Sequence, residues 1–140
     1  MKPCVYAVRC PDYGSVGPKV AELLEMMGGI AQFVLRNETI VLKPNLLEIT
    51  RPECAVTTHP SLVAAVGRIA KNAGARPIIA DSPGSGLPNT RGTLKRLYQV
   101  CGMMQAAEEA GIEVNWDTSF QHVSFLDGKL IKHFEVITPI

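Results

Sequence analysis

Apolar segments with the character of buried strands alternate with helical segments along the chain, and no other feature constrains the fold as much. The strands are expected at residues 4–9, 39–42, 77–80 and 112–116. The apolar residues between them recur at helical spacing, which predicts one helix in each of the first two gaps and two in the third. Strands that alternate with helices pair in parallel. The sequence therefore predicts a doubly wound α/β fold, with a mostly parallel sheet of about four or five strands and helices on both faces.

The chain changes character near its C-terminus. In HVSFLDGKLIKHFEV, apolar residues alternate with polar ones on both sides of Asp127-Gly128. This dipeptide is typical of a tight turn between antiparallel strands. We therefore expect a C-terminal β-hairpin in addition to the sheet, within a single α/β domain that spans residues 1–140.

Composition supports a folded core and argues against two classes of partner. Hydrophobic residues make up 46% of the chain, which is enough apolar material for an interior. The formal net charge is +1 and aromatic residues are 6%, so neither a basic surface nor a base-stacking platform for nucleic acid is expected. No apolar run approaches the ~20 residues of a membrane span. We expect neither a nucleic-acid nor a membrane partner.

The four cysteines are widely scattered, at Cys4, Cys10, Cys54 and Cys101. No two of them have the Cys-x-x-Cys spacing of a metal or iron–sulfur site, so no metal site and no cofactor are expected within this chain. A chain with this much core does not need a disulfide framework. The N-terminus also lacks the features of a signal peptide. These observations predict reduced, mostly buried thiols in a cytoplasmic protein.

The loops that follow the predicted strands are where a site is expected, because ligands of open α/β sheets bind outside the carboxyl ends of the strands. Lys43 follows the second predicted strand and Asp81 follows the third. Lys43 can contact an anion, and desolvation would lower its pKa towards that of a usable base. Alternatively, it lies along the sheet edge and pairs with Asp81. Asp81 can bind a ribose hydroxyl, a metal or Lys43. These two residues are the candidate catalytic groups.

Other polar residues near the same strand ends are candidate ligand-binding residues, namely Asn45, Arg51, Thr57, Thr58, His59, Ser82 and Gly84. Several have a structural interpretation as well. Asn45 can cap a turn through its side chain. Thr58 or His59 can cap the helix that opens at Pro60, whose N-terminus also favours an anion. Arg51 can clamp a carboxylate or simply be solvated.

The segment DSPGSG, residues 81–86, lies between a predicted strand and a predicted helix. This is the context of a glycine-rich anion loop. The segment nevertheless matches neither the dinucleotide-binding fingerprint nor the P-loop. Its glycines, Gly84 among them, serve either a turn or the close approach of a ligand.

A family resemblance rests on several phrases that occur together in order and spacing. The most specific are IVLKPNL, AVTTHPSLVAAVGRIAKNAGA and IIADSPGSG. They resemble the N-terminal part of domain of unknown function 362, a family whose members are often described as iron–sulfur cluster-binding proteins. The resemblance covers nearly the whole chain. EITRP, residues 48–52, is in addition similar to an element of the N-terminal domain of nickel-pincer lactate racemase, a more distant relative.

The chain departs from the pattern of that family in two ways. His59 stands where the family usually has aspartate before the helix-opening proline. Family members also continue past the position of Ile140 into a PKLKTH-like motif, and many add a CxxCxxCxxxCP motif for a 4Fe-4S cluster. Neither motif is present here, so the resemblance implies the N-terminal portion of a longer family domain without the cluster. An incomplete sheet would expose an edge and apolar surface, which predicts a homo-oligomer.

Two functions are compatible with these residues. The first is half of an enzyme-like site for a small anionic or phosphorylated ligand at the carboxyl edge of the parallel sheet. The second is a non-catalytic accessory or scaffold module of an iron–sulfur, electron-transfer family. In the second case the polar residues form only turns, caps and an ion pair.

Overall fold

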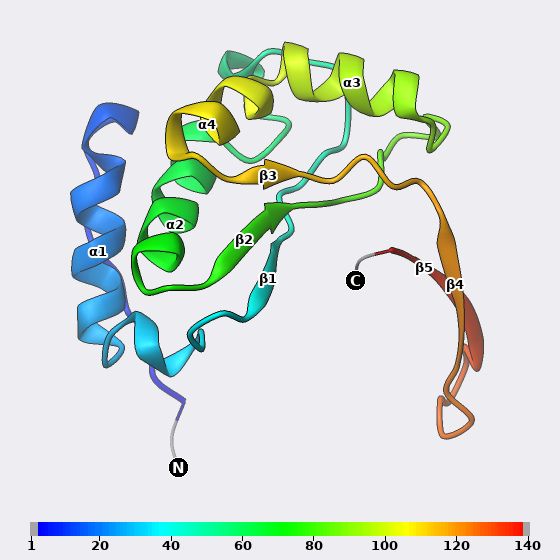
Figure 1. Ribbon diagram of the computed structural model, residues 1–140, viewed down its shortest axis with the longest axis horizontal. Coiled ribbons are helices and arrows are strands. Elements are labelled where there is room, and N and C mark those ends of the chain that lie inside the picture. Colours follow the sequence, from blue (N-terminus) through cyan, green and yellow to red (C-terminus); the bar gives the residue numbers. More distant parts are fainter. Residues whose placement is uncertain (1–2, 139–140) are drawn as a thin grey trace.

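The computed structural model describes residues 3–138 (Figure 1). The helices are α1 Val16–Met26, α2 Pro60–Asn72, α3 Arg91–Val100 and α4 Met103–Ala110. The strands are β1 Thr39–Leu42, β2 Arg76–Ile79, β3 Glu113–Val114, β4 Phe120–Ser124 and β5 His133–Ile137. Three 3-10 turns complete the elements, namely η1 Tyr13–Ser15, η2 Ile30–Gln32 and η3 Pro52–Cys54.

The first three strands form a parallel sheet in the order β1-β2-β3. Leu42 of β1 lies opposite Ile79 of β2, and Ile79 in turn lies opposite Val114 of β3. Helix α2 connects β1 to β2, and α3 and α4 connect β2 to β3 (Figure 1). The mixed α/β fold and the parallel pairing expected from the alternating pattern are therefore confirmed.

Local sequence explains where the central helices begin and end. Pro60 occupies the first turn of α2, where its missing N–H leaves no helical hydrogen bond unmade. Gly102 and Gly111 flank α4 with φ angles of 77° and 62°. These left-handed values are accessible to glycine without a steric cost, so both ends of the helix can turn sharply.

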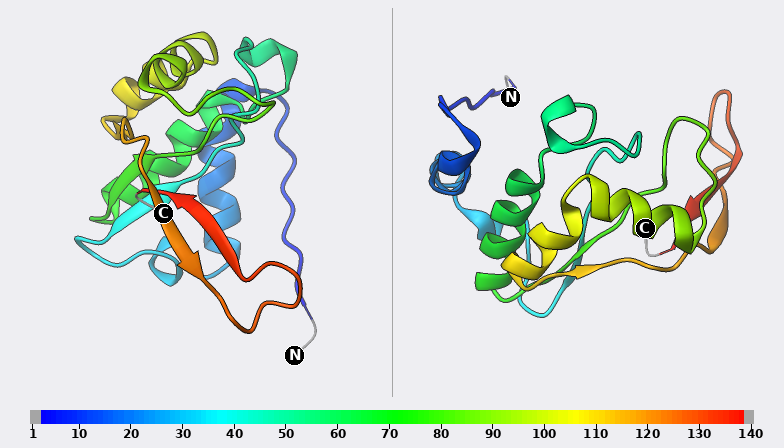
Figure 2. Two further views of the ribbon diagram at one scale, coloured as in Figure 1. Left: turned by 90° about the vertical axis from the view of Figure 1, so that its right-hand side faces the viewer. Right: turned by 90° about the horizontal axis from the view of Figure 1, so that it is seen from above.

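The main core lies between the sheet and helices α2, α3 and α4. Its largest fully buried side chains are Leu46, Ile79, Leu94, Leu97, Tyr98, Cys101 and Met103. Gly67 lets α2 approach the sheet closely, because a Cβ atom at this position would lie 2.6 Å from Cδ1 of Ile112. The right-hand view of Figure 2 shows the helices gathered on one side of the sheet.

The N-terminal segment differs from the prediction. Residues 4–9 are extended chain outside the sheet rather than its first strand (Figure 2). Val5 is 93% exposed, so the segment's Val and Tyr content reflects no burial. Strand propensity depends on a pleated surface and a partner edge, and no strand found within residues 3–138 pairs with this segment. Within residues 3–138 the sheet thus has three strands and helices on one side, instead of four or five strands with helices on both faces.

The cysteines also differ from the prediction. Cys4, Cys10 and Cys54 are exposed and only Cys101 is buried. Cys101 packs in the main core beside Tyr98, where burial raises the pKa of its thiol. A thiol there remains protonated and acts as a small apolar side chain.

Strands β4 and β5 form the C-terminal hairpin predicted around Asp127-Gly128. Asn115 joins this hairpin to the sheet and is only 7% exposed. Its backbone N–H donates to the carbonyl of Ile79 at 2.8 Å. Its side-chain amide donates to the carbonyls of Asp117 at 2.9 Å and Thr138 at 3.1 Å. Asn115 thereby fixes where the hairpin leaves the sheet.

None of the helices found between residues 3 and 138 combines the length and the apolar character required to cross a membrane.

Candidate functional site

Lys43 and Asp81 meet at the carboxyl edge of the parallel sheet. Lys43 directly follows β1, and Asp81 comes two positions after the end of β2. Because Leu42 and Ile79 are paired in register, the two strands deliver these residues to one place. The Nζ atom of Lys43 lies 2.7 Å from Oδ1 of Asp81. The two candidate catalytic residues are therefore in direct contact, in the pairing that was one of the alternatives for Lys43.

Asp81 is the fixed partner of this ion pair and is only 6% exposed. Its Oδ1 also accepts from the N–H of Ser82 at 2.9 Å, and its Oδ2 accepts from the N–H of Leu46 at 3.3 Å. A carboxylate that accepts backbone N–H groups and faces an ammonium is stable as a buried charge. Lys43, whose side chain is 61% exposed, is the partner that can reach a ligand.

Tyr98 lies beneath Asp81 in the core and is fully buried. Its ring packs edge-to-face against Trp116, with the centroids 5.5 Å apart. Burial in the first place, and the negative charge of Asp81 in the second, raise the pKa of Tyr98 well above its usual value of 10. The phenol therefore remains neutral.

A cavity of about 210 Å³ opens beside the ion pair. It is lined by Lys43, Asp81 and Ser82 from the sheet edge, and by Phe120, Glu135, Val136 and Ile137 from the hairpin. The hairpin thus supplies one wall of the cavity. On its other side, Lys43 borders a second cavity of about 190 Å³, whose further lining includes Thr58 and the apolar Leu62 and Val66 of α2. Lys43 thus contributes to the lining of both cavities, and we call the first, which Asp81, Ser82 and Glu135 also line, the polar cavity.

Asn45 and Thr58 fasten the loop after β1 to the start of α2. The N–H of Asn45 donates to Oγ1 of Thr58 at 2.9 Å, and the N–H of Thr58 donates to the carbonyl of Asn45 at 3.3 Å. The side chain of Asn45 reaches the carbonyl of Val56 at 3.4 Å. These bonds hold the loop that carries Lys43. Thr57 is buried next to them, and its hydroxyl has no hydrogen-bond partner within residues 3–138.

His59 is the N-cap of α2. Its Nδ1 accepts from the N–H of Ser61 at 3.3 Å and lies 2.8 Å from the Ser61 hydroxyl oxygen. Its ring stacks on Tyr13 with the centroids 3.5 Å apart. Burial lowers the pKa of His59, against a smaller raising effect of Glu53. The imidazole therefore performs the capping role and favours its neutral form.

The remaining predicted residues lie in different surroundings. Ser82 lines the polar cavity and contributes its N–H to Asp81. Gly84 packs against Leu47, and a Cβ atom at position 84 would lie only 3.0 Å from the Cα of Leu47. The small residue is thus explained by contact between two loops. Arg51 is exposed at the start of η3, and no hydrogen bond or ion pair within residues 3–138 joins it to Lys43 or Asp81.

Phe120 and Glu135 were not among the predicted site residues. The alternating pattern of residues 120–137 indicates a hairpin, and it also indicates which side chains share a face. It carries no signal for where the hairpin lies relative to the sheet. That position depends on the buried amide of Asn115, which a sequence pattern does not distinguish from an ordinary turn residue.

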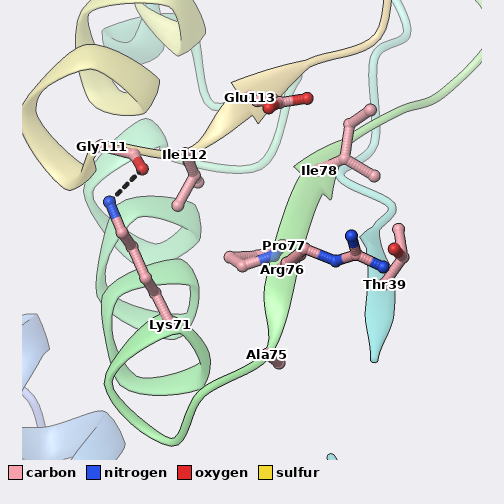
Figure 3. A pocket seen from close by; sticks show the side chains of 9 residues that line it. All are labelled: Thr39, Lys71, Ala75, Arg76, Pro77, Ile78, Gly111, Ile112 and Glu113. Atoms are coloured by element: carbon pink, nitrogen blue, oxygen red, sulfur yellow. Dashed lines mark hydrogen bonds between the residues drawn. The ribbon is translucent and has the colours of Figure 1, made fainter. Parts of the chain in front are cut away.

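Another cavity, of about 320 Å³, lies at the opposite, amino end of the strands (Figure 3). Thr39, Arg76 and Glu113, the first residues of the three strands, contribute to its lining. Its lysine, Lys71, is already engaged, since its Nζ donates to the carbonyl of Gly111 just beyond α4. This is the edge at which α/β sheets do not bind ligands, and we assign the cavity no role.

The described residues do not fit an iron–sulfur cluster. Such a cluster needs several thiolates in one place. Here Cys101 is buried in the core, whereas the other three cysteines are exposed. Between residues 3 and 138, no group of three or more His, Cys, Asp and Glu side chains is arranged to hold a metal ion.

The fold and the site define an α/β protein with polar groups clustered at the carboxyl edge of a parallel sheet. The chain belongs to the family described as domain of unknown function (DUF362), whose model matches residues 40–140. The family resemblance of the sequence is thereby confirmed, whereas the similarity to lactate racemase stays a prediction.

A curated relative is the "Thylakoid-associated protein sll1697" of Synechocystis sp., which is 41% identical over 75 residues. These residues make up 54% of this chain and 23% of the relative, so the similarity concerns less than a quarter of that protein. No solved structure matches the chain.

Proposed function

We propose that this chain provides the ligand-binding half of an enzyme-like site for a small molecule with a carboxylate or phosphate group. One observation carries the proposal. An exposed ammonium, that of Lys43, is held at the mouth of a cavity by a carboxylate, that of Asp81, which is only 6% exposed. An ordinary surface lysine has no such anchor. Burial of the Asp81 charge costs free energy of solvation. A buried ion pair is retained where a defined geometry is useful.

The residues have distinct roles in this proposal. Lys43 binds the anionic group, because an ammonium has three N–H donors and Asp81 occupies only one of them. Asp81 orients the ammonium through their 2.7 Å contact. Ser82 adds a hydroxyl to the cavity wall. Asn45, Thr57 and Thr58 position the loop that carries Lys43.

Thermal unfolding in the presence of inorganic phosphate, L-lactate or AMP tests the proposal. A ligand at 100 times its dissociation constant adds about 2.7 kcal/mol to the free energy of unfolding. We expect at least one of these anions to raise the midpoint of unfolding, and we expect Lys43→Met to abolish the effect. Lys95→Met is the matched control, because it removes the same charge from the exposed face of α3. Equal stabilisation of both variants contradicts the proposal.

The second candidate function is an accessory module of an iron–sulfur protein family. Its support is that Asp81 already has an ammonium and two backbone N–H groups as partners, so the ion pair is complete without a ligand. In that case Lys43→Met changes the free energy of unfolding, but it does not alter the response of the midpoint of unfolding to added anions. The exposed thiols of Cys10 and Cys54 suit a reducing compartment, and a cytoplasmic location is part of either proposal.

A further inference from the structure

The cavity beside Lys43 has an uneven charge balance. One ammonium, of Lys43, and two carboxylates, of Asp81 and Glu135, contribute to its lining. Lys43 and Asp81 neutralise each other at 2.7 Å. The charge of Glu135 is not compensated by a second cation in the lining, so a simple anion in this cavity is attracted by Lys43 and repelled by Glu135.

Lys43 and Glu135 both keep unused hydrogen-bonding capacity. Asp81 engages one donor of the ammonium and leaves two free. Within residues 3–138, the carboxylate of Glu135 has one ion-pair contact, with Nδ1 of the exposed His122 at 3.4 Å. Lys43 and Glu135 form no ion pair with each other in that part of the chain. The cavity therefore offers free donors at one point of its wall and free acceptors at another.

The hairpin register brings apolar surface to the same cavity. Side chains alternate along a strand, so Glu135 and Ile137 share one face of the hairpin. Phe120 lies opposite Ile137 in the antiparallel pairing and also lines the cavity. A ligand that satisfies both Lys43 and Glu135 also meets this apolar surface.

We infer that the ligand of this site is a small zwitterion, with a carboxylate or phosphate for Lys43 and an ammonium for Glu135. The inference rests on the proposed function and narrows its ligand class. A cavity of about 210 Å³ can hold a small molecule such as an α-amino acid or an amino-alkyl phosphate.

Calorimetric titration with matched ligands tests this inference. L-alanine and L-lactate differ only in an ammonium against a hydroxyl, and O-phosphoethanolamine and ethyl phosphate differ in a terminal ammonium. We expect the zwitterion of at least one pair to bind at least tenfold more tightly than its partner. Selectivity in the first pair identifies a carboxylate ligand, and selectivity in the second identifies a phosphate ligand. Equal binding within both pairs overturns the inference.

Glu135→Gln identifies the group responsible for the selectivity. The substitution keeps the size of the side chain and removes its charge, at a position where the side chain is 54% exposed. We expect it to reduce the preference for the zwitterion at least tenfold while leaving the affinity for the simple anion unchanged or higher. Glu108→Gln, on the exposed surface of α4, controls for the loss of one negative charge. Selectivity that persists in Glu135→Gln overturns the inference.

The two proposals fail in different ways. If simple anions bind in a Lys43-dependent manner and zwitterions bind no better, the zwitterion inference is wrong and the proposed anion site stands. If neither ligand of either pair binds, both proposals are wrong.

Discussion

His59 caps helix α2, a role that aspartate also fills in proteins, and it makes the cap dependent on pH. Its Nδ1 accepts from the N–H of Ser61, a bond that an aspartate cap could make at any neutral pH. The imidazole makes this bond only when Nδ1 carries no proton. Stacking on Tyr13 holds the ring in place for this purpose. The cap of α2 is therefore sensitive to acid.

We expect the free energy of unfolding to fall as the pH is lowered from 8 to 5. Because burial lowers the pKa of His59 in the folded state, the unfolded chain binds the proton first, near pH 6.5. The stabilisation by the neutral cap is complete above this pH and is lost as the pH falls through the lowered pKa. A lost cap costs about 1 kcal/mol. Urea denaturation across this range measures the effect.

His59→Asn is the control for this prediction, since asparagine is a strong N-cap that does not titrate. The variant keeps the other two histidines, His122 and His133, so any remaining pH dependence of its stability belongs to other groups. An identical pH dependence in the variant and the wild-type protein would show that the cap does not titrate as described.

At the scale of elements, Asn115 joins the hairpin to the sheet through its hydrogen bonds. We expect Asn115→Ala to cost about 1–3 kcal/mol of stability, because it leaves partly buried backbone groups of Asp117 and Thr138 without their partners. Hydrogen exchange of β4 and β5 should become faster while α2 and α4 remain protected. The polar cavity should lose its ligand response, since the hairpin supplies one wall.

A matched control for this prediction is Asn89→Ala. Within residues 3–138, the side chain of Asn89 makes one hydrogen bond, of 3.3 Å, to the carbonyl of Thr118 just before β4. Its loss should leave the protection of the hairpin nearly unchanged. If Asn115→Ala has no larger effect on exchange than Asn89→Ala, the buried amide does not hold the hairpin in place.

At the scale of the whole molecule, the tip of the hairpin exposes much apolar surface. Phe125, Leu126, Leu130 and Ile131 are between 56% and 95% exposed. Exposed apolar patches usually become interfaces. We therefore expect the chain to self-associate, and we expect the double variant Leu130→Ser, Ile131→Ser to reduce its weight-average mass in sedimentation. Val5→Ser, at another exposed apolar residue, is the control. A wild-type chain that stays monomeric at high concentration contradicts this prediction.

The sequence predicted those parts of the fold that local patterns determine. Helical spacing and the proline at position 60 indicated α2, and the residues that follow the strands led to Lys43 and Asp81, which are in contact. It predicted a strand at residues 4–9, where Val and Tyr are frequent but where no strand of the described chain, residues 3–138, pairs with the segment. It also missed Glu135, because the docking of the hairpin depends on a buried amide rather than on periodicity.

The location of the site has a consequence for folding. Lys43 and Asp81 are separated by 38 positions, and Lys43 and Glu135 by 92. Closing loops of this length costs entropy before any contact compensates for it, and such long-range contacts form slowly. The cavity is therefore complete only when the sheet and the hairpin are both in place. Ligand binding at this edge should accordingly report the fully native population, whereas helical circular dichroism also detects chains in which only α2, α3 and α4 have assembled.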